Sequence, residues 1–141
     1  GTSALGLYAN AYAFRGCVQG DPFDTTAMTV NGDITVDQEI EFGAFDATDT
    51  SVHIVYMGWQ ADDITTTPTD LVNGGVTVTF RNAQETTTGS DATAMLWSVD
   101  HDGTNLAAVT KTITTTAGSS FGYTFGLLPA TADTLNSQRM I

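Results

Sequence analysis

Hydrophobic and polar residues alternate along several short stretches of this chain, and clusters of Gly, Asn and Asp separate these stretches. A period of two places successive side chains on opposite faces of a β-strand, so each stretch predicts a strand. Several short strands between turn residues are typical of an all-β sandwich or barrel. The stretches that predict strands are 3–15, 26–30, 33–42, 51–59, 76–80, 93–99, 106–113 and 119–128.

Two dipeptides between these stretches predict tight turns. Asn31-Gly32 follows the stretch 26–30, and Asn-Gly favours a two-residue hairpin because both positions accept a positive φ. Asp102-Gly103 lies between 93–99 and 106–113 and predicts a second hairpin connection over residues 98–105. The stretch 51–59 is mostly apolar on both faces, which indicates a central strand.

The N-terminal stretch 3–15 differs from the others because both of its faces are apolar and Arg15 is its only charge. A long apolar strand at a chain end is an aggregation hazard unless another strand pairs with it. Insertion into the sheet of a neighbouring subunit would satisfy its main-chain groups. The residues that we predict at such a subunit interface are Leu5, Leu7, Tyr8, Ala9, Ala11, Tyr12 and Phe14.

The predicted fold is therefore an all-β, antiparallel β-sandwich of about eight strands, either a jelly roll or immunoglobulin-like. A chain of 141 residues is of ordinary size for one domain, so we expect residues 1–141 to form a single domain. Residues 1–15 would be its N-terminal strand, exchanged with a neighbouring subunit. Residues 129–141 would be a short tail with one or two helical turns around 132–139.

Composition sharpens this picture. Four Lys and Arg residues stand against sixteen Asp and Glu residues, for a net charge of −12, and twenty-six threonines favour strands. A strongly negative field repels phosphates, so nucleic acid and anionic membrane surfaces are poor partners. No apolar run is long enough to span a membrane. We expect an extracellular or cell-surface protein.

Candidate catalytic residues are few. His53 and His101 are the only histidines, and Cys17 is the only cysteine. Nucleophilic catalysis needs a nucleophile, a base and an orienting group together, and no Gly-x-Ser-x-Gly elbow occurs. We interpret His53 as half-buried in a strand, His101 as solvated and Cys17 as buried. The sequence predicts no catalytic residue and no enzyme.

Calcium is the ligand that the acidic loops favour most, since hard cations take carboxylate and carbonyl oxygens. Asp100 and Asp102 show part of an EF-hand-like spacing, but Val109 occupies the position that needs a bidentate Glu. A turn is the better interpretation of this segment. We therefore predict no cofactor and no metal site, with Asp100 and Asp102 as weak calcium candidates.

Aromatic and threonine-rich segments suggest two further partners. Trp59 and Trp97, with Tyr8, Tyr12, Tyr56 and Tyr123, are compatible with a sugar-stacking platform, although their apolar strands favour core packing. Threonine triplets at 65–67, 86–88 and 114–116 are compatible with O-glycans, and no Asn-x-Ser/Thr sequon occurs.

These features favour a structural subunit that assembles with copies of itself into an extracellular filament or pilus, joined by strand addition through the N-terminal strand. A virion coat, tail-tube or decoration protein is the first alternative, because the same small fold and self-association would serve there. A secreted carbohydrate- or calcium-binding module is the second alternative. The absence of a predicted catalytic set agrees with all three.

Overall fold

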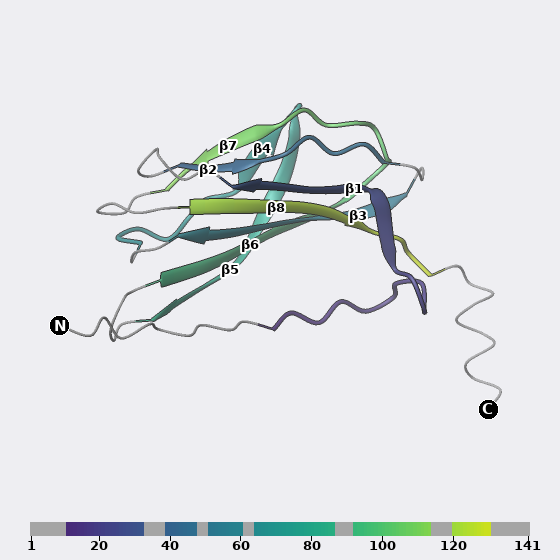
Figure 1. Ribbon diagram of the computed structural model, residues 1–141, viewed down its shortest axis with the longest axis horizontal. Helices are drawn as coiled ribbons and strands as arrows, with labels where there is room; N and C mark the ends of the chain where they lie inside the picture. The colour runs from purple at the N-terminus through teal and green to yellow at the C-terminus, as the bar shows by residue number, and fades with distance from the viewer. Residues whose placement is uncertain are drawn as a thin grey trace.

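The computed structural model describes residues 11–32, 39–47, 51–60, 64–86, 92–113 and 120–130, including all their side chains except those of residues 25–32 and 86. This part of the chain contains eight strands and no helix, and every strand pair is antiparallel (Figure 1). The all-β prediction is therefore confirmed. The strands are β1 (Phe23–Gly32), β2 (Glu39–Phe42), β3 (Val52–Gln60), β4 (Leu71–Asn73), β5 (Val76–Thr86), β6 (Ala92–His101), β7 (Val109–Thr112) and β8 (Ser120–Leu127).

The strands form two sheets. Six of them make a curled sheet in the order β1-β8-β3-β6-β5-β4, and β2 pairs with β7 in a small second sheet. Figure 1 shows the small sheet lying over one face of the larger one. We call that face the inner face and the opposite one the outer face. The predicted central strand 51–59 corresponds to β3, which lies between β8 and β6.

The main core lies between the small sheet and the inner face. Ile40 and Phe42 of β2 are fully buried there, together with Tyr56 of β3 and Trp97 of β6. The Phe42 ring meets the Tyr56 ring edge-on at 5.2 Å and the Trp97 ring at 5.8 Å. Edge-to-face aromatic packing of this kind stabilises a core beyond the area that it buries.

Glycines let β2 approach the inner face closely. Gly58 of β3 and Gly122 of β8 are cross-strand partners under β2. A Cβ at Gly122 would overlap the carbonyl oxygen of Glu41 and lie 2.6 Å from the Phe42 ring. The backbone of β2 therefore occupies the space that a side chain would need, and this explains why a glycine stands in the middle of a buried strand.

Both predicted hairpins are wrong, because the strands that flank each turn belong to different sheets. β1 pairs with β8 while β2 pairs with β7, and Asn31 and Gly32 are ladder residues opposite Gly122 and Phe121. The connection over 98–105 likewise joins β6 of the large sheet to β7 of the small one. Gly103 in that connection does have a positive φ of 84°, so the local turn prediction holds where the pairing prediction fails.

A hairpin that the sequence analysis did not predict joins β4 to β5. Gly74 and Gly75 have φ values of 57° and 84°, and Asn73 pairs with Val76 across them. Two successive positive φ values define a type I′ turn, which Gly-Gly favours. β5 also continues to Thr86, past its predicted end at Phe80, through a bulge between Phe80 and Asn82.

The two ends of the chain are described only in part. Residues 11–15, the described part of the predicted strand 3–15, belong to no strand, so that prediction is wrong there. Residues 1–10 lie outside the described residues. So do residues 131–141, which include the predicted helical turns.

Candidate functional site

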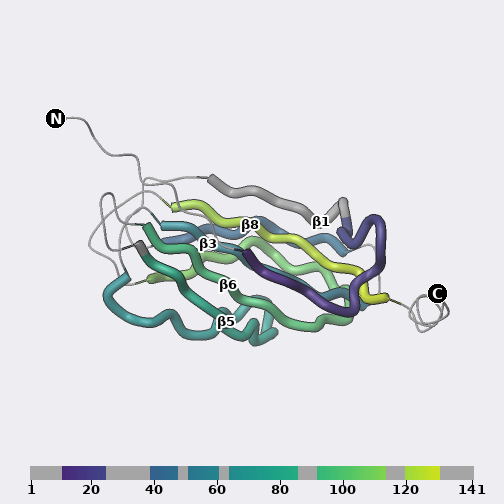
Figure 2. Tube along the Cα trace, turned by 90° about the horizontal axis from the view of Figure 1, so that it is seen from below, coloured from purple at the N-terminus to yellow at the C-terminus, as the bar shows by residue number. Residues whose placement is uncertain are grey.

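The N-terminal arm, which we define as residues 11–18, lies over the outer face of the large sheet. Figure 2 views the molecule from below and shows this purple segment running along β6 and β8 in front of the sheet. Its side chains make the contact, because they join an apolar cluster of the outer face. That cluster combines Tyr12, Phe14 and Cys17 of the arm with buried Val55, Leu96 and Leu127 and with half-buried Met57 and Phe125.

Backbone hydrogen bonds anchor the arm at its C-terminal end. Val18 N–H donates to the Leu128 carbonyl at 2.9 Å, and Ala130 N–H donates to the Gly16 carbonyl at 2.7 Å. Gly16 and Gly20 flank this anchor with φ values of 78° and 97°, a conformation that glycine adopts without strain. The arm therefore joins the domain at residues 16–18 and covers the sheet beyond that point through side chains.

A histidine–carboxylate pair lies beside the arm. His53 of β3 and Asp100 of β6 are cross-strand partners, and His53 Nδ1 is 2.7 Å from Asp100 Oδ1. The Phe14 ring packs 5.7 Å from the imidazole. The His53 side chain is 26% exposed and that of Asp100 is 95% exposed, so water screens the pair and weakens it.

Cys17 lines the same pocket of about 410 Å³ as His53 and Asp100. A nucleophile and its base need to lie within hydrogen-bond reach of each other. The part of the chain that the structure describes shows no hydrogen bond between Cys17 and His53. The three side chains share a pocket there without forming the contacts of a triad.

The two calcium candidates are engaged separately. Asp100 contacts His53, whereas Asp102 Oδ1 accepts a hydrogen bond from Thr104 N–H at 2.9 Å within its own turn. That bond is the main reason why the pKa of the Asp102 carboxyl is lowered. Among residues 11–130 as far as they are described, no group of three His, Cys, Asp or Glu side chains could hold a metal ion.

The inner-face aromatic residues are core residues, as the sequence predicted for Trp97. Trp97 is fully buried, and its Nε1–H donates to the Thr69 carbonyl at 2.9 Å. Tyr56 is fully buried as well, and its hydroxyl accepts a hydrogen bond of 3.2 Å from Asn73 Nδ2. Burial raises the pKa of the Tyr56 phenol. Neither ring is available to a sugar.

A set of aromatic side chains does reach the surface on the outer face. Trp59 stacks on Phe121 with ring centroids 5.0 Å apart and planes 22° apart, and Tyr123 meets Phe121 edge-on at 5.3 Å. We call the hollow of about 180 Å³ that these rings line, together with Tyr12 and Met57, the aromatic groove. Tyr123 is 37% exposed, which is high for a large ring beside a core.

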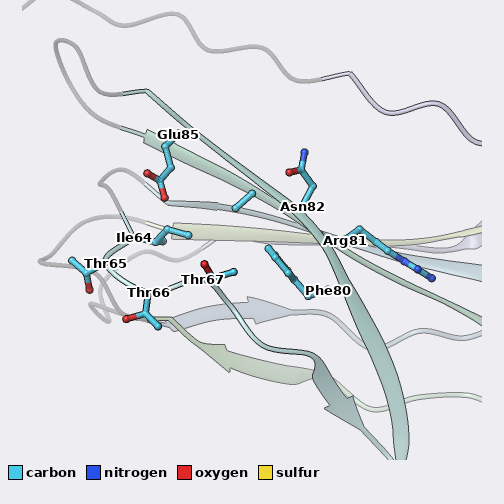
Figure 3. Close-up of a pocket in the computed structure, with 9 residues that line it drawn as sticks. Ile64, Thr65, Thr66, Thr67, Phe80, Arg81, Asn82 and Glu85 are labelled. Atoms are coloured by element: carbon cyan, nitrogen blue, oxygen red, sulfur yellow. The ribbon is translucent and has the colours of Figure 1, made fainter.

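A further pocket, of about 390 Å³, lies between residues 64–67 and the bulged part of β5. Figure 3 shows Thr65 and Thr66 on one side and Asn82 and Glu85 on the other, while the Arg81 side chain points away from the threonines. The Arg81 guanidinium donates to Ser98 Oγ at 3.0 Å. The threonines at 65–67 are exposed and belong to no strand, whereas residues 87, 88 and 114–116 of the other two triplets lie outside the described residues.

The structure describes three of the seven predicted interface residues. Tyr12 and Phe14 are half-buried against the outer face, and Ala11 is exposed. Leu5, Leu7, Tyr8 and Ala9 lie outside the described residues. The sequence analysis named Tyr12, Trp59 and Tyr123 among the rings of a candidate platform but missed Phe121. The alternation of Phe121, Tyr123 and Phe125 on one face of a predicted strand was the visible signal for it.

The described residues include no helix long and apolar enough to cross a membrane. No protein-family model, no curated protein and no solved structure matches this chain.

Proposed function

We propose that this protein is a structural subunit that assembles with copies of itself into an extracellular filament or pilus, joined through its N-terminal segment. The observation that carries the proposal is the way the arm meets the sheet. Its described residues 11–15 belong to no strand, yet Tyr12 and Phe14 cover an apolar face. Because these contacts come from side chains on one continuous segment, the same segment of a neighbouring subunit can make them.

The anchor of the arm suits such an exchange. Exchange of an identical element between subunits costs little, since it replaces each contact with its equivalent. A segment that is exchanged needs a connection whose backbone can change direction. Gly16 and Gly20 provide one, because both have a positive φ and glycine moves between positive and negative φ without strain.

Charge supports the same contact. The chain has a net charge of −12, but its first acidic residue is Asp21, and no side chain before Arg15 is charged. Two acidic subunits repel each other over a distance, whereas an uncharged segment can approach an acidic neighbour without that cost. The acidic remainder of the surface would keep completed assemblies apart.

The edge strand β1 can accept an added strand from a neighbouring subunit. β1 is ten residues long and forms one edge of the large sheet, and no described strand pairs with its other side. A sheet edge of that length is a template for a strand from another chain. We propose in addition that the two sheets together constitute a β-sandwich, whose β1 edge and outer face both serve the assembly.

Electron microscopy of the full-length protein beside a variant that lacks residues 1–15 tests this function. We expect filaments with the full chain and dispersed subunits with the truncation. A variant that lacks residues 131–141 is the matched control and should still assemble. A synthetic peptide of residues 1–15, added in excess to the full-length protein, should shorten the filaments, whereas a scrambled peptide should not.

Dispersed monomers of the full-length protein at every concentration would overturn the proposal. Closed shells that depend on residues 1–15 would retain self-assembly and replace the filament by the virion alternative. The shape of the particles therefore separates the two forms of assembly.

A further inference from the structure

We propose that the aromatic groove binds the stretch of chain that precedes the arm, residues 5–10, with Tyr8 packed on Trp59 and Phe121. The described part of the arm ends at this groove, because Tyr12 lines it together with Met57, Trp59 and Tyr123. The inference names an interaction surface and its occupant, and it goes beyond the proposed function because it does not depend on assembly.

The direction of the arm supports this occupant. Phe14 packs on His53, near the beginning of β3. Tyr12, two residues earlier in the chain, lies beside Met57 and Trp59, near the end of β3. Followed toward its N-terminus, the chain therefore runs along β3 in the direction of the Trp59–Phe121 pair, and residues 1–10 continue from there.

The spacing of residues selects Tyr8. Tyr12 and Phe14 both face the sheet, and an extended chain returns to the same face at every second residue, which includes Tyr8. Four extended residues span about 13 Å, whereas Trp59 lies about 7 Å beyond Met57 along β3. Tyr8 therefore has enough chain to reach the far side of the stacked pair.

The chemistry of the two surfaces agrees. No charged residue lines the groove, and no charged side chain occurs in residues 1–14. An uncharged, aromatic segment thus meets an uncharged, aromatic groove, and an added ring prefers an offset or edge-on position against Trp59. Docking would also cover Tyr123, which is 37% exposed in the described structure.

The groove would be filled in the same way on the sheet of the same chain or on that of a neighbour. Whichever subunit supplies Tyr12 and Phe14 also supplies Tyr8, because the segment is continuous. The inference and the proposed function can therefore fail independently of each other.

Tryptophan fluorescence provides the test, since Trp59 lines the groove and Trp97 is fully buried. Removal of residues 1–10 should shift the emission of Trp59 to the red and raise its quenching by acrylamide severalfold. Tyr8→Ala should produce a large part of the same change. Leu7→Ala is the matched control, because docking of Tyr8 would turn the Leu7 side chain away from the groove, and it should leave the quenching nearly unchanged.

Disulfide trapping provides a second measurement that does not rely on a deletion. In a Cys17→Ser background, Tyr8→Cys combined with Tyr123→Cys should form a disulfide on oxidation, whereas Leu7→Cys with Tyr123→Cys should not. Mixing chains that carry one cysteine each shows whether the segment comes from the same chain or from a neighbour.

Three results would overturn the inference. Trp59 could keep its emission and quenching when residues 1–10 are absent. Leu7→Ala could expose Trp59 more than Tyr8→Ala does. An added glycan could protect Trp59 in the full-length protein, which would make a sugar the occupant. The truncation could also abolish the filaments while the emission and quenching of Trp59 stay the same. That result would refute docking in the groove and support the proposed function.

Discussion

The two faces of the large sheet are covered in different ways. On the inner face, β2 lies so close that a Cβ at Gly122 would overlap its backbone and one at Gly58 would lie 2.8 Å from Ile40 Cδ1, and Phe42 is fully buried. On the outer face, the cover is a segment without strand structure, and its Tyr12 and Phe14 remain half-buried. One cover is a sheet that belongs to the folded core. The other is an arm held by residues 16–18.

The difference shows that apolar burial on two faces of one sheet can serve two purposes. The inner contact is packed at the density of a protein interior, so a change in the volume of one side chain there destabilises the packing of its neighbours. The outer contact leaves part of each ring in water and therefore costs less to separate. A subunit that exchanges an arm needs a half-buried arm that separates easily, and beneath it a core that is tightly packed.

Truncation of one phenylalanine on each face gives the largest expected contrast. Phe42→Ala should lower the free energy of unfolding by about 3–5 kcal/mol, because it leaves a cavity under fully buried rings. Phe14→Ala removes a half-buried ring and should cost only about 1 kcal/mol. Urea denaturation of both variants measures the difference. Equal losses would mean that the arm is as integral to the fold as β2, and the comparison would fail.

Substitution of the inner-face glycines sharpens the comparison. Gly122→Ala should cost about 3 kcal/mol, since the new methyl group meets the backbone of β2 and the Phe42 ring, which cannot both yield. Gly58→Ala is the matched control, because its Cβ would meet side-chain atoms rather than backbone, at 2.8 Å from the terminal Cδ1 of Ile40 and 3.3 Å from the Trp97 ring. It should cost about 1 kcal/mol. Similar losses for the two variants would show that β2 can shift as a whole.

Substitution of Tyr56 should cause the smallest loss of stability, and this loss should depend on pH. Tyr56→Phe removes the hydrogen bond from Asn73 and should cost about 1 kcal/mol at neutral pH. The pKa of the buried phenol is raised above its ordinary value of 10.0. Above that ordinary value the unfolded chain has lost a proton that the native state still holds, so the stability due to Tyr56 falls as the pH rises.

The advantage of the wild type over Tyr56→Phe should therefore be constant below about pH 9 and shrink above about pH 10. Urea denaturation of both proteins from pH 7 to pH 11 measures this difference, and groups that titrate equally in both cancel from it. A difference that stays constant to pH 11 would show that the phenol is not shielded from water on the inner face.

Two strands of the large sheet were predicted well. The predicted stretch 51–59 corresponds to β3 and 119–128 to β8, within one residue at each end. Both faces of β3 are packed against apolar side chains, as its apolar composition predicted, with Tyr56 in the main core and Met57 in the outer cluster. These predictions succeed because a period of two is a local property of the chain.

The candidate site could be predicted only in part. Tyr12 and Phe14 were expected to make an interface, and they do contact a sheet, but they contact its face rather than its edge. Trp59 and Phe121 are 62 positions apart in the chain, and only the pairing of β3 with β8 brings them together. Alternation within a single strand carries no information about such a partner.

By itself the sequence determined the all-β class, the central strand, the turn at Gly103 and an uncharged apolar segment at the N-terminus. Each of these depends on neighbouring residues alone, through side-chain alternation, the freedom of glycine at positive φ, or local composition. The tertiary structure decided which strands share a sheet, why Gly58 and Gly122 are glycines, and which face the arm covers. These outcomes depend on packing between distant segments, where the space left by one strand is set by the side chains of another.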